Sequence, residues 1–347
     1  HCQYIREAFV ARRLILRCHE LAHKAAADDR DTQKLISELG TVADELGEQL
    51  SLTHEIPDMP TATAEAMALD RLMGGLRTGS LHVFAARPGM GKTAFALFMA
   101  VNAAKQGVPV CVYSLEMSRE QLIFRMLGQI ADVEPSKITK GTATEEEMRA
   151  LEEASRQLKE LPICINQRSD IQIDEIRCDI SLRRRQGKCS LAIIDYLQLV
   201  NRDDKGQTPN EAISNITRKA KITAMDEEIP IVLLCQLNRN CETRGTYSFR
   251  HQLSDLRDSG SIEQDADTVA FISRLSVVNI HEDPDTHLPT RGRGTILLAK
   301  NRQGELGHVR FMHNEGVTSF WDDTQPACVR KARAAEPKPK GKGLFEC

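Results

Sequence analysis

Aromatic residues are scarce in this chain, at 4% of its 347 residues, whereas hydrophobic residues of all kinds make up 41%. No apolar stretch approaches the roughly 18 residues that a membrane-spanning helix needs, and no secretory leader opens the chain. The formal net charge of −3 gives no general attraction to nucleic acid, so contacts with DNA depend on local groups of Arg and Lys. We therefore expect a cytoplasmic protein, without a membrane partner, that has an aliphatic α/β core.

The chain has ten cysteines, but none has the C-x-x-C spacing of redox or zinc sites. Cys111, Cys164 and Cys235 lie in apolar stretches that have the composition of buried strands. We interpret them as reduced residues of the core rather than as partners in disulfides.

The most informative segment reads A-R-P-G-M-G-K-T at 86–93 and follows the apolar stretch Leu81–Ala85, which we expect to be a buried strand. It matches the phosphate-binding loop G-x-x-x-x-G-K-S/T, except that Ala86 replaces the first glycine. The alternative is a turn rich in Gly and Pro that begins a helix by chance. The strand before the segment and the helix expected at Thr93–Ala104 favour a nucleotide site.

Each residue type in such a loop has a physical role. Gly89 and Gly91 allow the backbone to turn its N–H groups toward phosphates. Lys92 reaches the β- and γ-phosphate oxygens, and the Thr93 hydroxyl binds Mg²⁺. The loop residues expected to contact ATP are Ala86, Arg87, Pro88, Gly89, Met90, Gly91, Lys92 and Thr93.

Beyond this loop, expected helices alternate with short strands rich in Val and Ile, which is the pattern of βαβ units in a parallel sheet. The expected strands are Val108–Leu115, Leu161–Ile165, Leu191–Asp195, Ile229–Cys235, Thr268–Ile272 and Thr295–Lys300. Two capping boxes, Ser118 with Gln121 and Thr144 with Glu147, predict where helices begin between these strands.

Three of these strands lead into polar residues, at the sheet edge where ligands bind in parallel α/β proteins. Asp195 ends its strand and is the candidate for Mg²⁺ and its waters, the alternative being an exposed turn aspartate. Glu116 follows Leu115 and would orient the attacking water, unless it is only an acid favoured by a helix dipole. Gln236 follows Cys235, and its amide would sense the γ-phosphate by hydrogen bonding.

The two ends of the chain depart from this pattern. Helical patterns cover Ile5–Leu21 and Thr32–Leu50, and a linker containing two prolines is expected at Thr53–Ala64. The segment Ala327–Cys347 is rich in Lys, Arg and Pro, so we expect a disordered tail. Because the chain begins at His1 inside a helical pattern, we expect a fragment or a processed chain.

From about Leu69 to Phe320 the sequence resembles the DnaB-type replicative DNA helicases, hexameric motors with a RecA-like ATPase core. The segments that carry the resemblance are A-R-P-G-M-G-K-T (86–93), Y-S-L-E-M-S (113–118), I-I-D-Y-L-Q-L (193–199), Q-L-N-R (236–239), D-L-R-D-S-G-S-I-E-Q-D-A-D (255–267) and K-N-R (300–302). The long segment at 255–267 is the most discriminating, because recombinase-like relatives share the first three only in looser form.

The resemblance implies a RecA-like P-loop NTPase fold, with a mainly parallel twisted sheet flanked by helices and preceded by a helical linker segment. It implies a ring-shaped homohexamer that uses ATP and Mg²⁺ to translocate 5′→3′ on single-stranded DNA and to unwind duplexes. Lys92 and Thr93 would then bind phosphate and Mg²⁺. Asp195 would bind the Mg²⁺ water, and Glu116 would be the catalytic base.

Further residues have roles only through this resemblance. Arg125, nine residues past Glu116, matches an arginine that contacts bound nucleotide, and Gln236 matches a switch that couples the γ-phosphate to the DNA loops. Lys300 and Arg302, with Asn301 between them, match a pair that reaches into the neighbouring subunit's nucleotide site. Without the resemblance, a basic pair that protects a sheet edge would be the favoured interpretation.

The DNA contacts are implied in the same way. Arg257, Asp258 and Gly260 match the central-channel loop that grips the backbone of single-stranded DNA. The family commonly has glutamate at the position of Asp258. Since aromatic platforms for stacking are scarce, we expect binding to be mainly electrostatic and strongly dependent on salt.

The expected domains are residues 1–30 as the end of a helical amino-terminal domain, 31–64 as the linker helix and linker, 65–323 as the ATPase and helicase domain, and 324–347 as the basic tail. Most of the amino-terminal domain would then be absent. A helicase loader is a possible partner, and a primase contact is doubtful because that domain is the usual primase contact.

Three other functions stay open on sequence grounds. A recombination or repair ATPase would act on single-stranded DNA without unwinding it, and would be expected to carry additional DNA-binding domains or a zinc module. A small-molecule P-loop kinase would need a lid and an acceptor pocket within one monomer. A nucleotide-dependent scaffold without turnover would follow if the Ala86 replacement abolished hydrolysis.

Overall fold

The computed structural model describes residues 68–168, 170–195, 197, 208–237, 251–256, 259–284, 286–314, 316 and 319–323. All of them fall within one compact unit, Asp58–Cys347. The expected amino-terminal helices, the linker and the basic tail lie outside the described residues, as do Arg257 and Asp258. Among the helices that are described, none has the length and apolar character needed to cross a membrane.

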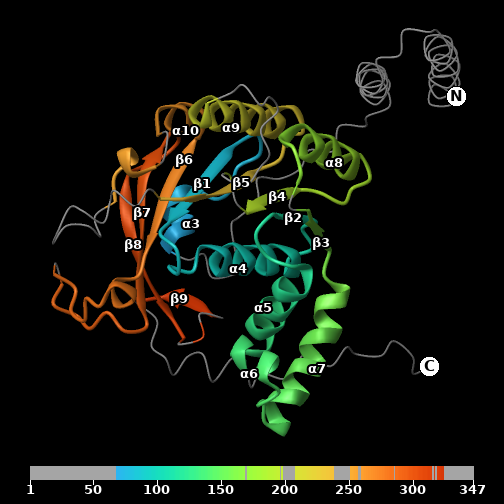
Figure 1. Ribbon diagram of the computed structural model, residues 1–347, viewed down its shortest axis with the longest axis vertical. Coiled ribbons are helices and arrows are strands. Elements are labelled where there is room, and N and C mark those ends of the chain that lie inside the picture. The colour runs from blue at the N-terminus through green and yellow to red at the C-terminus, as the bar shows by residue number, and fades with distance from the viewer. Residues whose placement is uncertain are drawn as a thin grey trace, which may run out of the picture. The chain divides into compact units, whose positions relative to one another are not determined.

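Helices and strands alternate along most of the described chain (Figure 1). The helices are α3 (Ala68–Met73), α4 (Lys92–Lys105), α5 (Arg119–Ala131), α6 (Pro135–Lys140), α7 (Glu145–Glu160), α8 (Ile173–Arg185), α9 (Pro209–Asp226) and α10 (Ser259–Asp265), with the 3-10 helices η3 (Leu253–Asp255) and η4 (Leu275–Val278). The strands are β1 (Leu81–Ala86), β2 (Val110–Ser114), β3 (Ile163–Gln167), β4 (Leu191–Asp195), β5 (Ile231–Gln236), β6 (Thr268–Ser273), β7 (Arg293–Asn301), β8 (Gly307–His313) and β9 (Phe320–Asp322).

In the described part of the chain the strands form one sheet, in the order β3-β2-β4-β5-β1-β6-β7-β8-β9. The six strands from β3 to β6 are parallel to one another, which confirms the expected mainly parallel α/β sheet. The expectation that the strand at Thr295–Lys300 continues this parallel pattern is wrong, because β7 runs antiparallel to β6. A parallel pairing needs a long crossover, usually an α-helix, whereas only the short η4 and a loop join β6 to β7.

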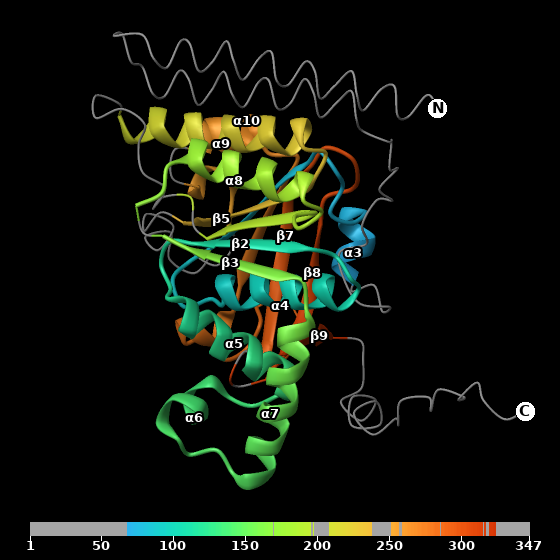
Figure 2. The same ribbon diagram turned by 90° about the vertical axis from the view of Figure 1, so that its right-hand side faces the viewer.

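Two hydrophobic cores lie on the two faces of the sheet, with α4 and α5 on one face and α8 and α9 on the other (Figure 2). Neighbouring residues of β1 point to opposite faces: Phe84 packs with α4, and Val83 packs with α8 and α9. Most of the buried phenylalanines lie on the α4 face, where the rings of Phe95 and Phe320 meet edge to face at a centroid distance of 5.5 Å. Burial on both faces explains why the parallel strands read as continuous apolar runs.

Local signals in the sequence fix the helix starts well. The Ser118 side chain accepts a hydrogen bond from the Gln121 amide at the start of α5, and Thr144 and Glu147 make the same reciprocal box at α7. Both predicted capping boxes are therefore confirmed. A third box that we did not predict begins α9, where Thr208 is the N-cap.

Three strands begin later than expected, each directly after a proline. Pro109, Pro162 and Pro230 precede β2, β3 and β5. Proline has no N–H to donate to a strand ladder. The carbonyls of all three nevertheless accept hydrogen bonds from neighbouring strand residues, so the prolines stay aligned with the sheet.

The buried histidine in β1 makes the stability of this fold sensitive to acid. His82 is 3% exposed, and its burial lowers its pKa from 6.5 to about 4; the Lys221 charge adds to the lowering, and the Asp267 charge opposes it. The unfolded chain takes up this proton below pH 6.5, whereas the folded chain does so only below about pH 4. The stability that comes from neutral His82 is therefore complete above pH 6.5 and is lost as the pH falls toward 4.

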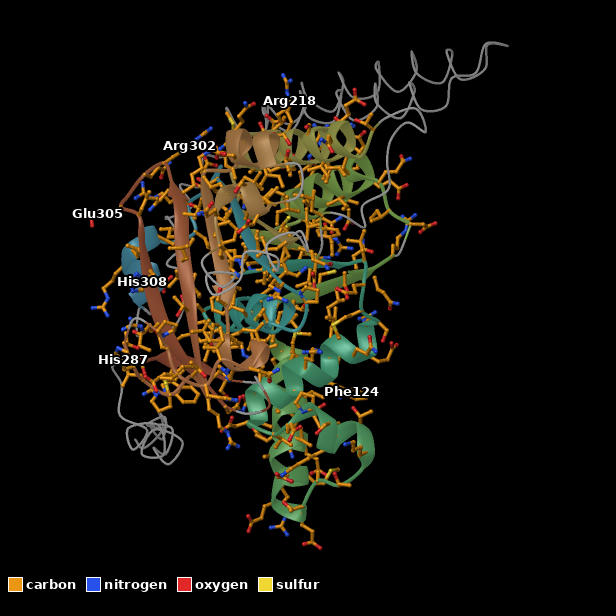
Figure 3. All side chains as sticks on the ribbon, turned by 60° about the vertical axis from the view of Figure 1, so that its left-hand side comes forward. Phe124, Arg218, His287, Arg302, Glu305 and His308 are labelled. Atoms are coloured by element: carbon orange, nitrogen blue, oxygen red, sulfur yellow. The ribbon has the colours of Figure 1, made fainter. Side chains whose placement is uncertain are left out.

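Between pH 7 and pH 4.5 the wild type should lose about 2 kcal/mol of stability through His82, and we predict that His82→Leu abolishes this loss, since leucine fills a similar volume and does not titrate. The free energy of unfolding, measured with urea at pH 7 and at pH 4.5, gives the difference. His308→Leu, at an exposed position in β8 (Figure 3), is the matched control and should keep the acid dependence of the wild type. An equal acid dependence in His82→Leu and the wild type would contradict the assignment.

Candidate active site

The segment between β1 and α4 is a short, tightly turned loop. The Met90 amide donates to the Arg87 carbonyl at 3.3 Å, which closes the turn, and the Met90 side chain is buried in the core on the α4 face. Pro88 and Gly89 are left exposed at the tip. The buried Met90 side chain therefore anchors the loop to the core, and the tip of the loop is exposed to solvent.

Glycine is required at two positions of this loop. Gly89 has φ 78° and Gly91 has φ 90°, in the left-handed region that other residues rarely adopt. Gly91 is the N-cap of α4, and no side chain caps that helix end, so the first turn of α4 keeps backbone N–H groups for an anion. Ala86, by contrast, is still a residue of β1, and its small side chain lies in the core. A normal strand conformation explains why alanine replaces glycine there.

The first turn of α4 meets the end of β4. The Thr93 hydroxyl donates to Asp195 Oδ2 at 2.7 Å, and the Lys92 ammonium lies 3.5 Å from Asp195 Oδ1. Asp195 is 2% exposed, and its Oδ1 accepts no hydrogen bond from the described residues. The structure thus brings the three predicted residues Lys92, Thr93 and Asp195 together.

The donor set of this cluster suits Mg²⁺. A carboxylate, a hydroxyl and water are the ligands that this ion prefers. Because Thr93 donates its hydrogen to Asp195, the lone pairs of its oxygen stay available to a cation. Asp195 Oδ1 is buried and lies beside the Lys92 ammonium. These residues fit a magnesium–nucleotide complex.

Glu116 and Gln236 lie at the same edge of the sheet. The Leu115 amide donates to the Asp195 carbonyl at 2.8 Å, which places the exposed Glu116 one residue away from the end of β4. Gln236 is the last residue of β5 and pairs in register with Ala86, the residue that leads into the loop. The rule that polar residues gather at the carboxyl edge of parallel strands accounts for both placements.

Arg125 lies on α5, the helix that packs against α4. One helical turn further along, Gln129 Nε2 donates to the Ala94 carbonyl at 2.7 Å, just past Thr93. Residues four apart lie on the same face of a helix, so the half-buried Arg125 lies on the α5 face that contacts α4. Nothing in the local sequence pattern distinguishes Gln129, which we did not predict.

Lys300, Asn301 and Arg302 lie near the amino-terminal ends of the parallel strands, whereas the loop lies at their carboxyl-terminal ends. Asn301 pairs with Thr268, and Thr268 pairs with His82, four residues before Ala86 in β1. At the usual rise of a strand this separates the two ends by about 13 Å. Figure 3 shows Arg302 at the α10 end of the sheet, well away from Phe124 on α5. Within one chain the structure does not bring this segment to the loop.

The comparisons with known proteins agree with this arrangement. The family model for the DnaB-like helicase C-terminal domain matches residues 62–322. The chain belongs to this family. It is 36% identical to a probable replicative DNA helicase of Trieres chinensis over 73% of this chain and 55% of that protein, and 35% identical to the replicative DNA helicase DnaB of Geobacillus stearothermophilus over 77% and 57%. The chain therefore spans little more than half the length of these relatives.

Solved structures in this family share the fold. A DnaB-like replicative helicase, described with its interactions with primase, superposes with a TM-score of 0.74 at 28% identity, over 92% of this chain and 78% of that one. The ATPase domain of G40P superposes with a TM-score of 0.69 at 29% identity, over 85% of this chain and 99% of that one. The expected family and the expected fold are both confirmed.

One residue that touches the loop was missed in the sequence. Arg274 directly follows β6, and its Nη1 donates to the Gly89 carbonyl at 3.4 Å while its Nε lies 3.2 Å from His313 Nε2. Burial lowers the pKa of Arg274 and the pKa of His313. The strand-end rule that selected Asp195 would also have selected Arg274.

Among the predicted DNA-binding residues, only Gly260 is described, as an exposed residue near the start of α10.

The backbone conformation of the loop gives a stability prediction. Gly91→Ala should lower the free energy of unfolding by about 1–2 kcal/mol, because an L side chain is strained at φ 90°. Gly260→Ala is the matched control: a Cβ there meets no atom within 4 Å, so helix propensity should raise stability by up to about 1 kcal/mol. Equal unfolding free energies for the two variants in urea titrations would contradict the left-handed assignment of Gly91.

Proposed function

We propose that this chain is the motor part of a replicative DNA helicase that hydrolyses ATP and unwinds duplex DNA as a ring-shaped homohexamer. The observation that carries the proposal is the separation of the phosphate-binding loop from Lys300 and Arg302, which lie at opposite edges of one sheet. For Lys300 and Arg302 to act on a nucleotide bound at this loop, they must come from a neighbouring subunit. Hydrolysis then depends on assembly.

Within one subunit, the described residues divide the chemistry of ATP hydrolysis among them. Lys92 and the first-turn amides of α4 hold the phosphates, while Thr93 and Asp195 hold Mg²⁺. When bound, that ion neutralises charge on the β- and γ-phosphate oxygens. Glu116 accepts a proton from the water that attacks the γ-phosphorus, and the bond from that phosphorus to the bridging oxygen of the leaving ADP breaks.

Other groups complete the proposed site. Arg125 contacts the nucleotide from α5, and Gln236 hydrogen-bonds the γ-phosphate and transmits its presence to the DNA loops. From the neighbouring subunit, Lys300 and Arg302 offset the charge that develops on the γ-phosphoryl group, and Asn301 lies between them. A guanidinium supplied in this way is worth about 10³–10⁵ in rate.

The proposed DNA contacts are Arg257, Asp258 and Gly260, in a segment that runs into the first turn of α10 and would face the centre of the ring. One arginine and backbone N–H groups hold phosphates without reading the base sequence. Translocation in the 5′→3′ direction is proposed from the likeness to the family. Binding should weaken steeply with salt, because released counterions drive it.

The domain limits at 30, 64 and 323, and a cytoplasmic location, are further parts of the proposal. A helicase loader is a candidate partner of the ATPase domain. The replicative helicases with which the chain aligns support the proposal.

A strand-separation assay tests the function. On forked DNA with a 5′ single-stranded tail, the wild type should separate the strands when ATP and Mg²⁺ are present, and a 3′ tail alone should not support unwinding. Lys92→Ala should abolish separation, while Lys105→Ala, at the exposed last turn of the same helix, should leave it unchanged. ATP turnover stimulated by DNA without strand separation on either fork would favour a recombination-type ATPase instead.

The shared site gives a kinetic prediction. Arg302→Ala should lower kcat for ATP by about 10³-fold or more and leave KM nearly unchanged, because the guanidinium acts mainly on the transition state. Arg218→Ala, at an exposed position of α9 (Figure 3), is the control and should retain normal turnover. Normal turnover in Arg302→Ala would rule out the proposed role of this arginine.

A further inference from the structure

Arg302 is held by the end of α10 and the residues that follow it. Its backbone amide donates to the Asp267 carbonyl at 2.9 Å, and its Nη1 lies 3.4 Å from Asp267 Oδ1. Its Nη2 donates to the Gln264 carbonyl. The Arg302 side chain is nevertheless 47% exposed, so part of the guanidinium faces outward from this edge of the sheet.

Lys300 is held by the same segment. Its ammonium donates to the Ala266 carbonyl at 2.6 Å and to the Glu263 carbonyl. Carbonyls at the end of a helix lack partners within the helix, so cations are favoured there. Both cations of the K-N-R segment therefore have their position set by residues 263–267.

Asp267 is itself rigidly placed. Its side chain is 9% exposed, and Oδ2 accepts hydrogen bonds from the Leu81 amide at 2.8 Å and from the Lys221 ammonium at 2.7 Å. Lys221 also donates to the Gly79 carbonyl at 2.8 Å. One oxygen of Asp267 is thus fixed to the start of β1, and the other oxygen faces Arg302.

We propose that Asp267 is a positioning residue for catalysis, which orients Arg302 toward the nucleotide site of the neighbouring subunit. This inference rests on the proposed shared ATPase site. A guanidinium has five N–H donors in a planar fork. Asp267 and Gln264 engage one donor on each terminal nitrogen, which fixes the plane of the fork and leaves three donors for a phosphate.

The rate of ATP turnover distinguishes orientation of Arg302 by Asp267 from inhibition of Arg302 by Asp267. If Asp267 instead restrained Arg302 in its own subunit and competed with the neighbour's phosphate, removal of its charge would increase turnover. Orientation predicts a decrease, because a misplacement of about 1 Å costs up to roughly a hundredfold in rate. Asp267→Asn separates the two effects. The amide oxygen should keep the Leu81 and Lys221 donors, so the NH₂ group would face the Arg302 Nη1 and repel it.

Mixed assemblies isolate this effect from each subunit's own site. Arg302→Ala subunits keep their nucleotide-binding residues but supply no arginine, and Lys92→Ala subunits supply the arginine but cannot turn over ATP. Mixing the two in the presence of single-stranded DNA should restore hydrolysis. We expect Lys92→Ala/Asp267→Asn subunits to restore about 10- to 100-fold less, with the KM for ATP unchanged. Asp267→Glu in the same donor should recover part of the loss.

Lys221→Met in the Lys92→Ala donor is the matched control, because it removes one of the two donors to Asp267 Oδ2, keeps the Leu81 amide on that oxygen and leaves the oxygen that faces Arg302 unchanged. It should restore hydrolysis as well as Lys92→Ala alone. The inference would be overturned if the Lys92→Ala/Asp267→Asn donor restored hydrolysis fully or to a higher rate than Lys92→Ala alone. It would also be overturned if Lys221→Met reduced the restored rate as much as Asp267→Asn does. If the Lys92→Ala donor itself restores nothing, the shared site is wrong and the inference falls with it.

Discussion

The contact between Thr93 and Asp195 joins the two elements on which the rest of the site depends. It links the first turn of α4 to the end of β4 with a 2.7 Å hydrogen bond to a carboxylate that is almost fully buried. Lys92 meets the same carboxylate at 3.5 Å, so the cation and the anion balance each other away from water. The left-handed conformation of Gly91 starts α4 at the point that makes both contacts possible.

The direction of the strands then separates two kinds of chemistry. All six parallel strands end on the side of the phosphate-binding loop, which gathers Asp195, Glu116 and Gln236 at that edge. The antiparallel turn of β7 returns the chain to the other edge, where Lys300 and Arg302 lie against the end of α10. In the proposed function, a single subunit therefore has one half of the ATPase site at each end of its parallel strands. Association of identical subunits, each with the same orientation to the next, would bring the two halves together.

Short-range patterns in the sequence predicted the structure better than long-range contacts did. The capping boxes at Ser118 and Thr144 and the strand–loop–helix at 86–93 depend on neighbouring residues, and all of them are present. Strand starts were placed too early where a proline interrupts an apolar run. The reversal at β7 and the contact of Arg274 with Gly89, 185 residues away, depend on how elements pack, which no local pattern encodes. The distance between Arg302 and the loop likewise emerged only from the strand register.

The dependence of ATP turnover on assembly is the central claim, and the rate of hydrolysis per subunit as a function of protein concentration tests it most directly. With single-stranded DNA present, the account predicts that this specific rate is low in dilute solution and rises cooperatively as subunits associate. A specific rate that stays constant from dilute to concentrated protein, with or without DNA, would show that each chain contains a complete site. That result would contradict the account.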